Sequence, residues 1–258
     1  WARYHLIHGE SKERKKAYHE IKENLVFPEL CNSVDFIEKN THFLKQELIW
    51  GNPLPKNYSE LGELREFPYL GENVNAELNL CLIGVRKYKY EINLFLRYKE
   101  LYETFLLIGD YENAENQLTK IENEVCYSLW SLENRFVLKE LSGKASENKE
   151  FLSQFNDENK SKGLTKRLAH YLSLRAEHSL SINRYYNDLE ISLNNIKESN
   201  IKEAFQNYYR FKLTFLNHID FNNYGEIISL DFPLSVIDRY LNITRVLTNL
   251  LAVDRKST

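Results

Sequence analysis

The stretch "LIGDYENAENQLTKIENE", residues 107–124, decides the fold because it places a single glycine between two segments with helical patterns. Before Gly109, apolar side chains between residues 94 and 105 recur at the spacing of one helix face. Glycine adopts the left-handed conformation that ends a helix at little cost, so the first helix is predicted to end at Gly109. Apolar residues between 114 and 121 predict a second helix, and the two helices together form an αα-hairpin.

The same break recurs further along the chain. Gly143 lies 34 residues after Gly109, and other apolar positions match at the same offset. The matched pairs are Tyr98 with Leu132, Tyr102 with Phe136, Leu118 with Leu152, and Ile121 with Phe155. A stack of similar hairpins requires such a recurrence, because each hairpin buries one face against the next.

The remaining segments also have helical spacing and are separated by loop signals. The clearest loop is "WGNPLPKN", residues 50–57, and a second loop is predicted at residues 220–226. The stretch 73–108 predicts two helices or one bent helix. The last helix is predicted to follow Asp231 as its N-cap, with Pro233 in its first turn. Its apolar face is predicted to contain Leu234, Ile237, Leu241 and Leu247.

These patterns predict an all-α fold of stacked antiparallel helical hairpins, with roughly ten helices. Three parts are expected along the chain. They are an N-terminal helical pair with the proline-containing loop (1–70), a central pair of repeats (71–160), and C-terminal hairpins continuous with the repeats (161–258).

Composition bounds the class of protein. The net charge of −3 argues against a strongly basic nucleic-acid-binding protein. Cys31, Cys81 and Cys126 lie far apart in the sequence, as is typical of reduced thiols. No segment has the length and apolar character of a membrane span, and residues 1–16 lack the apolar core of a signal peptide. We therefore expect a cytoplasmic protein, and the absence of methionine indicates a piece of a longer chain.

The register of residues 94–160 resembles the tetratricopeptide repeat. In that family, large, small and aromatic residues line the first helix, and a glycine–aromatic turn precedes the second. The chain departs from this pattern at Tyr102, where a small residue is usual, and at Cys126, where a closing proline is usual. The resemblance implies a curved helical stack whose first helices line a binding groove. The first copy of the repeat is represented by Tyr98, Leu101, Tyr102, Phe105, Gly109, Tyr111, Ala114, Leu118 and Ile121.

The resemblance also implies which residues face the groove and bind a protein or peptide partner. Trp130 is either an anchor for the partner, since tryptophan is enriched at binding hot spots, or part of the hairpin core. Acidic residues outnumber lysines between residues 99 and 124, so a basic or apolar peptide is expected rather than a clamped carboxylate. The groove positions are Leu96, Lys99, Glu103, Leu106, Trp130, Glu133 and Val137.

A second candidate surface is the basic segment between residues 158 and 186. Basic side chains with neighbouring aromatics can hold phosphates and stack on unpaired bases. The alternative interpretation is a solvated helix face whose tyrosines, including Tyr171 and Tyr185, belong to the core. The candidate nucleic-acid-binding residues are Lys166, Arg167, His170 and Arg175.

Motifs for catalysis are weak. The run "SGKAS", residues 142–146, lacks the earlier glycine of a phosphate-binding loop and is better explained by the repeat glycine. His5, His8 and Glu10 have the spacing of metal ligands but form only one short cluster. Arg3 with His8 and Arg14 with His19 match the spacing of the helical ribonucleases of the HEPN family, but about one such pair is expected by chance in a chain of this composition. We predict no catalytic residues, no metal and no cofactor.

The favoured function is a non-catalytic helical-repeat scaffold that binds a protein or peptide partner. One alternative is an RNA-binding or RNA-cleaving domain that uses the basic segment 160–186. The other is a sensor domain that regulates an effector elsewhere in a longer chain.

Overall fold

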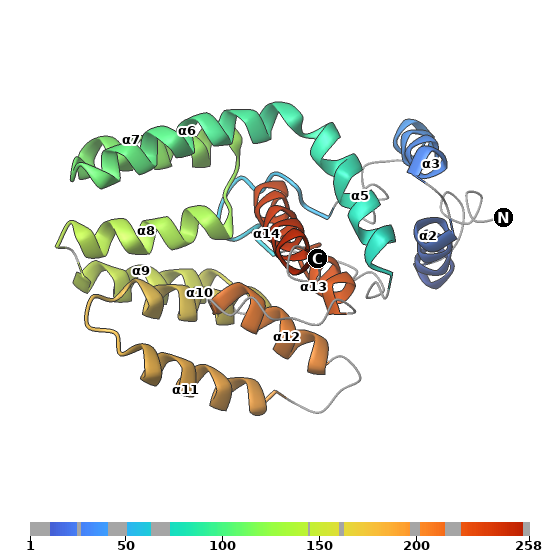
Figure 1. Cartoon of the computed structure of the whole chain (residues 1–258). Helices are drawn as coiled ribbons and strands as arrows, with labels where there is room; N and C mark the ends of the chain where they lie inside the picture. The colour runs from blue at the N-terminus through green and yellow to red at the C-terminus, as the bar shows by residue number, and fades with distance from the viewer. Residues whose placement is uncertain are drawn as a thin grey trace.

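The computed structural model of the chain describes residues 11–24, 27–40, 51–62, 73–143, 145–159, 163–196, 202–214 and 223–254. These residues form twelve α-helices and one π-helix, with no strand among them, which confirms the all-α class (Figure 1). The elements are α2 (Ser11–Asn24), α3 (Phe27–Asn40), α5 (Val74–Lys87), α6 (Lys89–Leu107), α7 (Tyr111–Lys120), η1 (Ile121–Val125), α8 (Leu129–Leu141), α9 (Ala145–Glu158), α10 (Gly163–Ala176), α11 (Ile182–Asn194), α12 (Lys202–Leu213), α13 (Tyr224–Leu230) and α14 (Val236–Asp254).

Two glycines make the turns that the sequence predicts. Gly109 and Gly143 both have a φ of 77°, in the left-handed region, and each follows the end of a helix. At the first turn, the Asp110 N–H donates to the Phe105 carbonyl at 2.9 Å, and the Gly109 N–H donates to the Leu106 carbonyl at 3.2 Å. These are the two hydrogen bonds of a Schellman motif, so the prediction for Gly109 is confirmed.

The recurrence in the sequence is matched by recurring helix ends. Helices α6 and α8 end at Leu107 and Leu141, and α7 and α9 begin at Tyr111 and Ala145. Figure 1 shows α6 with α7, then α8, α9 and α10, following one another down one side of the molecule. Helix α8 packs against α7, α9 and α10. The matched side chains that are buried are Tyr102, Leu118, Ile121, Leu132, Phe136 and Phe155.

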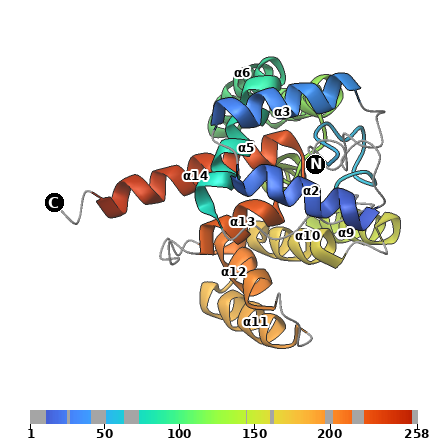
Figure 2. The ribbon, with the colours of Figure 1, turned by 90° about the vertical axis from the view of Figure 1, so that its right-hand side faces the viewer.

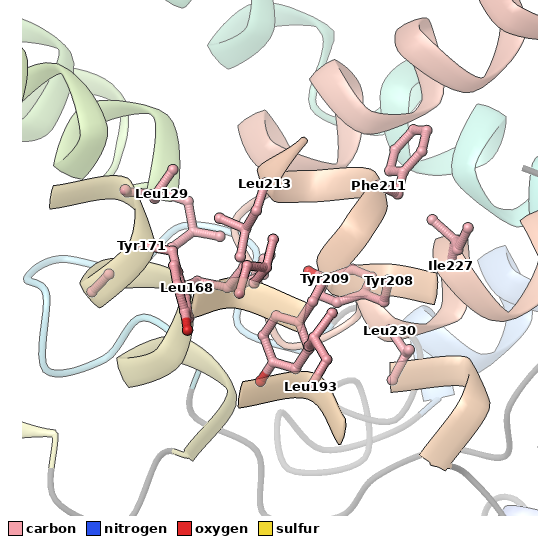
Figure 3. Close-up of a cluster of buried hydrophobic side chains, with 14 of the residues drawn as sticks. Leu129, Leu168, Tyr171, Leu193, Tyr208, Tyr209, Phe211, Leu213, Ile227 and Leu230 are labelled. Carbon is pink, nitrogen blue, oxygen red and sulfur yellow. The ribbon is translucent and has the colours of Figure 1, made fainter. Parts of the chain in front are cut away.

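The main hydrophobic core joins the central and C-terminal parts of the chain. One continuous cluster of buried side chains runs from Leu61 to Val246 and includes residues of α8, α10, α11, α12 and α13. Figure 3 shows part of this cluster, where Leu129 of α8 and Leu168 of α10 approach Leu213 of α12. The two parts therefore share an interior.

The N-terminal helices attach to α5. Ala17 and Ile21 of α2 and Leu30 of α3 form a smaller apolar cluster with residues of α5. A buried ion pair between Lys22 and Glu77 adds a polar contact between α2 and α5.

The loop predicted between residues 50 and 57 is non-helical over its described part, residues 51–57. It crosses between the C-terminal helix and the start of α8. The Val236 N–H donates to the Pro53 carbonyl at 2.8 Å, and the Tyr127 N–H donates to the Pro55 carbonyl at 3.0 Å. The loop thereby supplies acceptors to two segments that are distant in sequence.

Helix α14 is fixed to the start of α8 by one carboxylate. The Asp238 carboxylate accepts the N–H of Leu129 at 3.0 Å and the N–H of Trp130 at 3.1 Å. It also accepts the Ser235 hydroxyl at 2.8 Å. The first N–H groups of a helix lack partners within the helix, and they favour negative charge. Asp238, which lies on a different helix, therefore accepts two of the N–H donors that have no partner within α8.

The structure corrects three predictions about residues 220–247. Helix α13 begins at Tyr224, inside the predicted loop, because Ile227 and Ile228 are buried against neighbouring helices. Ser235, and not Asp231, caps α14: the Asp238 N–H donates to its hydroxyl oxygen at 3.1 Å. Leu247 is 40% exposed, although the apolar pattern placed it on the buried face.

Asp231 is used elsewhere. Its buried carboxylate accepts the Tyr208 hydroxyl at 2.7 Å and forms an ion pair with Lys212 at 2.9 Å. A carboxylate committed to these two donors is not available to cap a helix that begins at Val236.

The left-handed conformation of the two turn glycines predicts how replacing each of them with alanine changes the stability of the protein. Gly109→Ala and Gly143→Ala should each lower the free energy of unfolding by about 1–2 kcal/mol, because an L-residue is strained in the left-handed region. A Cβ at either glycine would meet no atom within 4 Å, so steric overlap with neighbouring atoms adds nothing to this cost. Chemical denaturation of each variant measures the change.

Gly163→Ala is the matched control for this prediction. Gly163 also has open space around a built Cβ, but it lies at the start of α10 without a positive φ. This variant should be as stable as the parent protein or slightly more stable. An equal loss at all three glycines would show that the left-handed conformation is not the cause.

Asp238→Asn should lower the free energy of unfolding by about 1–3 kcal/mol, because asparagine replaces one of the two accepting oxygens with an NH2 group that would face a donor. Burial raises the pKa of Asp238 above its ordinary value, and the positive charge of Lys212 and the hydrogen bonds to the carboxylate only partly oppose this. The native state then holds a proton that the unfolded state releases near pH 4, so this contribution to stability falls as the pH rises through the raised pKa.

The stability difference between the parent protein and Asp238→Asn should therefore be largest near pH 4 and narrow toward pH 7, since asparagine does not titrate. Urea denaturation of both proteins across this pH range measures it. A difference that widens with pH would mean that the hydrogen bonds outweigh burial and lower the pKa.

Candidate functional site

A pocket of about 590 Å³ lies where α8, α10, α12 and α14 meet. Pockets of this size are typical of sites that hold a small molecule or a short peptide segment. Half of its fourteen lining residues are apolar, and five are charged. We call it the α14 pocket, and it is lined by Leu129, Trp130, Glu133, Leu168, Leu172, Arg175, Phe211, Lys212, Leu213, Thr214, Asp238, Leu241, Asn242 and Arg245.

Two aromatic side chains form part of the wall. The Trp130 ring packs edge-on against Phe95 and Tyr102 of α6, with ring centroids 5.0 Å and 5.5 Å away. Phe211 of α12 lies under the guanidinium of Arg245, 4.4 Å from the ring centroid. Trp130 therefore belongs to the packing between α6 and α8 and also faces the pocket.

Four of the five charged residues in the pocket have compensating partners. Glu133 forms an ion pair with Arg175 across α8 and α10. Lys212 pairs with Asp231, and Asp238 accepts the N–H groups at the start of α8.

Arg245 has a different environment. Its guanidinium donates to the Thr214 carbonyl at 2.9 Å, near the end of α12, and within the described residues it pairs with no carboxylate. Burial lowers the pKa of Arg245, and the positive charge of Arg175 lowers it further. The pocket thus contains a partly desolvated cation whose charge is not neutralised by the part of the chain that the structure describes.

Asn242 is a buried polar residue in the same wall. Only 4% of its surface is exposed, and its Oδ1 accepts no hydrogen bond from the described residues. A buried amide oxygen without a donor costs free energy, so such groups are rare unless they serve another purpose. Asn242 and Arg245 are three residues apart on α14, which places them on the same side of the helix.

The structure separates the predicted groove residues. Trp130 and Glu133 line the α14 pocket, whereas the other five do not. Leu96 is partly exposed on α6, and Lys99 forms an ion pair with Glu103 at 2.6 Å. Leu106 packs against the buried Tyr102 cluster, and Val137 is half-buried on α8.

The four candidate nucleic-acid-binding residues do not share one surface. Arg167 donates to the Ser192 carbonyl and covers the Tyr209 ring, and Arg175 pairs with Glu133 in the pocket. Lys166 is half-buried, and His170 is exposed, although partial burial of its ring lowers its pKa. Residues 166 and 175 are nine positions apart, which places them on opposite sides of α10.

The neighbouring tyrosines are part of the interior. Tyr171 donates its hydroxyl to the Asp188 carbonyl at 3.1 Å, and Tyr185 donates to the Leu213 carbonyl at 3.1 Å. Both are buried, so these two rings are not available as stacking platforms.

The weak chemical motifs gain no support. Arg14 lies on α2, but its side chain is not described. Arg3, His5, His8 and Glu10 lie outside the described residues. The described part of the chain contains no group of three or more histidine, cysteine, aspartate or glutamate side chains arranged to hold a metal. None of the described helices is long and apolar enough to cross a bilayer.

Sequence reasoning missed the residues that α14 contributes. Asp238, Asn242, Arg245 and Asn249 recur at helical spacing, and all but Arg245 are buried. A polar stripe of this kind normally indicates a face toward solvent. The signal in the sequence was the length of this stripe, which spans residues 238–249.

Comparison of the chain with protein-family models, with curated proteins and with solved structures finds no match. The resemblance to the tetratricopeptide repeat therefore rests on the residues of this chain alone.

Replacing Asn242 by leucine should raise the free energy of unfolding by about 1–2 kcal/mol, because a buried acceptor without a donor is removed. The pocket beside Asn242 provides room for the larger side chain. Thermal and chemical denaturation of the variant test this. A loss of stability would indicate that the asparagine has a structural partner.

Proposed function

We propose that this protein is a non-catalytic binding protein of tetratricopeptide-like helical hairpins, and that a peptide segment of a partner protein binds in the α14 pocket. The observation that carries the proposal is the pocket itself, which is large enough for a few residues and lies between the first helices of successive hairpins.

The position of α14 supports the proposal that a peptide binds in this pocket. In a stack of repeats the first helices line the concave side, where partners bind. Helix α14 packs against α6 and α8, which are the first helices of the two hairpins. The chain's own last helix thus fills part of this side, and the pocket is the space that it leaves between α8, α10 and α12.

The charges change the expected chemistry of the peptide. Both acidic residues among the predicted groove positions have partners within the chain, Glu103 with Lys99 and Glu133 with Arg175. The apolar walls formed by Leu168, Leu172 and Leu241 favour apolar side chains. We therefore propose an apolar peptide segment.

The alternatives stay predictions. The basic segment loses support as an RNA-binding surface, since Arg167 and Arg175 are held in contacts within the chain. A sensor domain within a longer chain is compatible with the same pocket. The predicted cytoplasmic location also stays a prediction.

Filling the pocket tests the proposed function. Peptides selected from a random displayed library against the full chain should lose at least tenfold in affinity for Leu241→Trp, because the indole occupies the space that the peptide needs. Binding of the selected peptides is measured by fluorescence polarisation, and helicity by circular dichroism.

Leu251→Trp is the matched control. Leu251 is on the same helix, is 63% exposed and does not line the pocket. Figure 2 shows that this end of α14 extends away from the rest of the molecule. Peptides that bind both variants as tightly as the parent protein would place the binding surface elsewhere.

A further inference from the structure

We infer that two copies of this chain associate through the exposed side of α6, with the two helices antiparallel about a two-fold axis at residue 99. No residue of α6 lines the α14 pocket, so this inference goes beyond the proposed function. We call the surface the α6 face, and it consists of Tyr90, Arg97, Glu100, Leu101 and Ile108.

The α6 face exposes large apolar side chains at one end of the row of hairpins. Tyr90 and Ile108 are 74% and 70% exposed, and Leu101 is also exposed. These residues are 11 and 7 positions apart, close to three and two full turns, so they lie along one side of the helix. Figures 1 and 2 both place α6 at the upper edge of the molecule. The outer hairpin of a stack has no further repeat to cover it, and apolar side chains exposed there mark an interaction surface.

The spacing of residues on the α6 face is the same when it is read in either direction. From Tyr90 to Arg97, Leu101 and Ile108 the successive intervals are seven, four and seven residues. A two-fold axis at residue 99 therefore places Tyr90 of one copy opposite Ile108 of the second copy, and Arg97 opposite Leu101. A two-fold interface requires such self-complementarity, because each patch meets the same patch on the other copy.

The two ends of the α6 face carry exposed charges of opposite sign. Arg86 and Lys89 lie at its start, and Glu112 lies just beyond its end. An antiparallel pair brings the basic end of one copy to the acidic end of the second copy, whereas a parallel pair would place like charges together. The acidic end also disfavours nucleic acid, since it would repel phosphates.

The centre of the α6 face offers a further ion pair across the axis. Within the helix, Lys99 pairs with Glu103, on a different side from Arg97. Arg97 and Glu100 form no ion pair in the part of the chain that the structure describes. In the antiparallel pair Arg97 lies beside Glu100 of the second copy, and the two-fold axis makes this contact twice.

The size of the α6 face limits the strength of the association. Helix α6 has 19 residues, which gives a length of about 28 Å, and the face is one helix wide. Interfaces of this extent bury less than about 1,200 Å² in total and belong to the weak, transient class. Monomer and dimer are therefore expected to interconvert with protein concentration.

Sedimentation equilibrium of the full chain tests the inference. The apparent mass should rise from that of a monomer toward that of a dimer as the protein concentration increases. Arg97→Glu and Glu100→Arg should each raise the dissociation constant at least tenfold, because each places like charges together twice in the dimer. The double variant Arg97→Glu/Glu100→Arg exchanges the two signs and should associate as the parent protein does.

An equimolar mixture of the two single variants gives the sharpest result. In the mixed dimer both contacts join unlike charges, so the mixture should associate although each variant alone does not. Impaired folding cannot produce this pattern, because it would weaken the mixture as well. Circular dichroism of each variant checks that its helicity is unchanged.

Leu101→Asp and Ile191→Asp form a matched pair of apolar substitutions. Ile191 is also exposed but belongs to α11, at the opposite end of the molecule from α6 in Figure 1. Leu101→Asp should abolish association, and Ile191→Asp should leave it unchanged.

Three results would overturn the inference. They are a monomer at every soluble concentration, a dimer that persists in both single charge variants, and a dimer that is lost only with Ile191→Asp. Single-stranded RNA that binds the monomer and is released by Arg97→Glu would instead assign the α6 face to nucleic acid.

Discussion

A single carboxylate fixes the part of the molecule on which the candidate site depends. Asp238 accepts the N–H groups of Leu129 and Trp130 at the start of α8, while Ser128 accepts the N–H of the next residue, Ser131. The first turn of α8 thus has all its donors satisfied, two of them from α14. Because these contacts are buried and directional, they set the position of α14 along α8. Asn242 and Arg245, which follow one and two turns later, can face the pocket only when this register is kept.

The same region combines stabilising and destabilising features. Asp238 and Ser235 are saturated with hydrogen bonds, whereas Asn242 lacks a donor and Arg245 lacks a carboxylate within the described residues. Proteins depart from complete polar satisfaction mainly where binding or catalysis requires it. The unsatisfied groups lie together on one side of one helix and beside a cavity, and this arrangement separates them from the isolated buried amides elsewhere in the chain.

The departures from the repeat pattern have a structural role. Tyr102, which stands where a small residue is usual, is fully buried, and its ring meets Trp130 edge-on. Its hydroxyl donates to the Asn134 carbonyl at 3.4 Å. A large side chain at this position fills the space between α6 and α8 and holds Trp130 at the edge of the pocket. The two interpretations of Trp130, core residue and groove residue, are therefore compatible.

The sequence by itself determined the helical class, the turns at Gly109 and Gly143, and the burial of Tyr102 and Phe136, because these follow from local backbone preference and helical periodicity. It also named Trp130, Glu133 and Arg175, although it assigned the arginine to a different surface. Only the tertiary structure decided that the polar side of α14 faces the interior, that Ser235 caps this helix, and that Arg245 has no carboxylate partner among the described residues. The physical reason is that periodicity shows which residues share a helix face, whereas packing between distant segments decides whether that face meets water or protein.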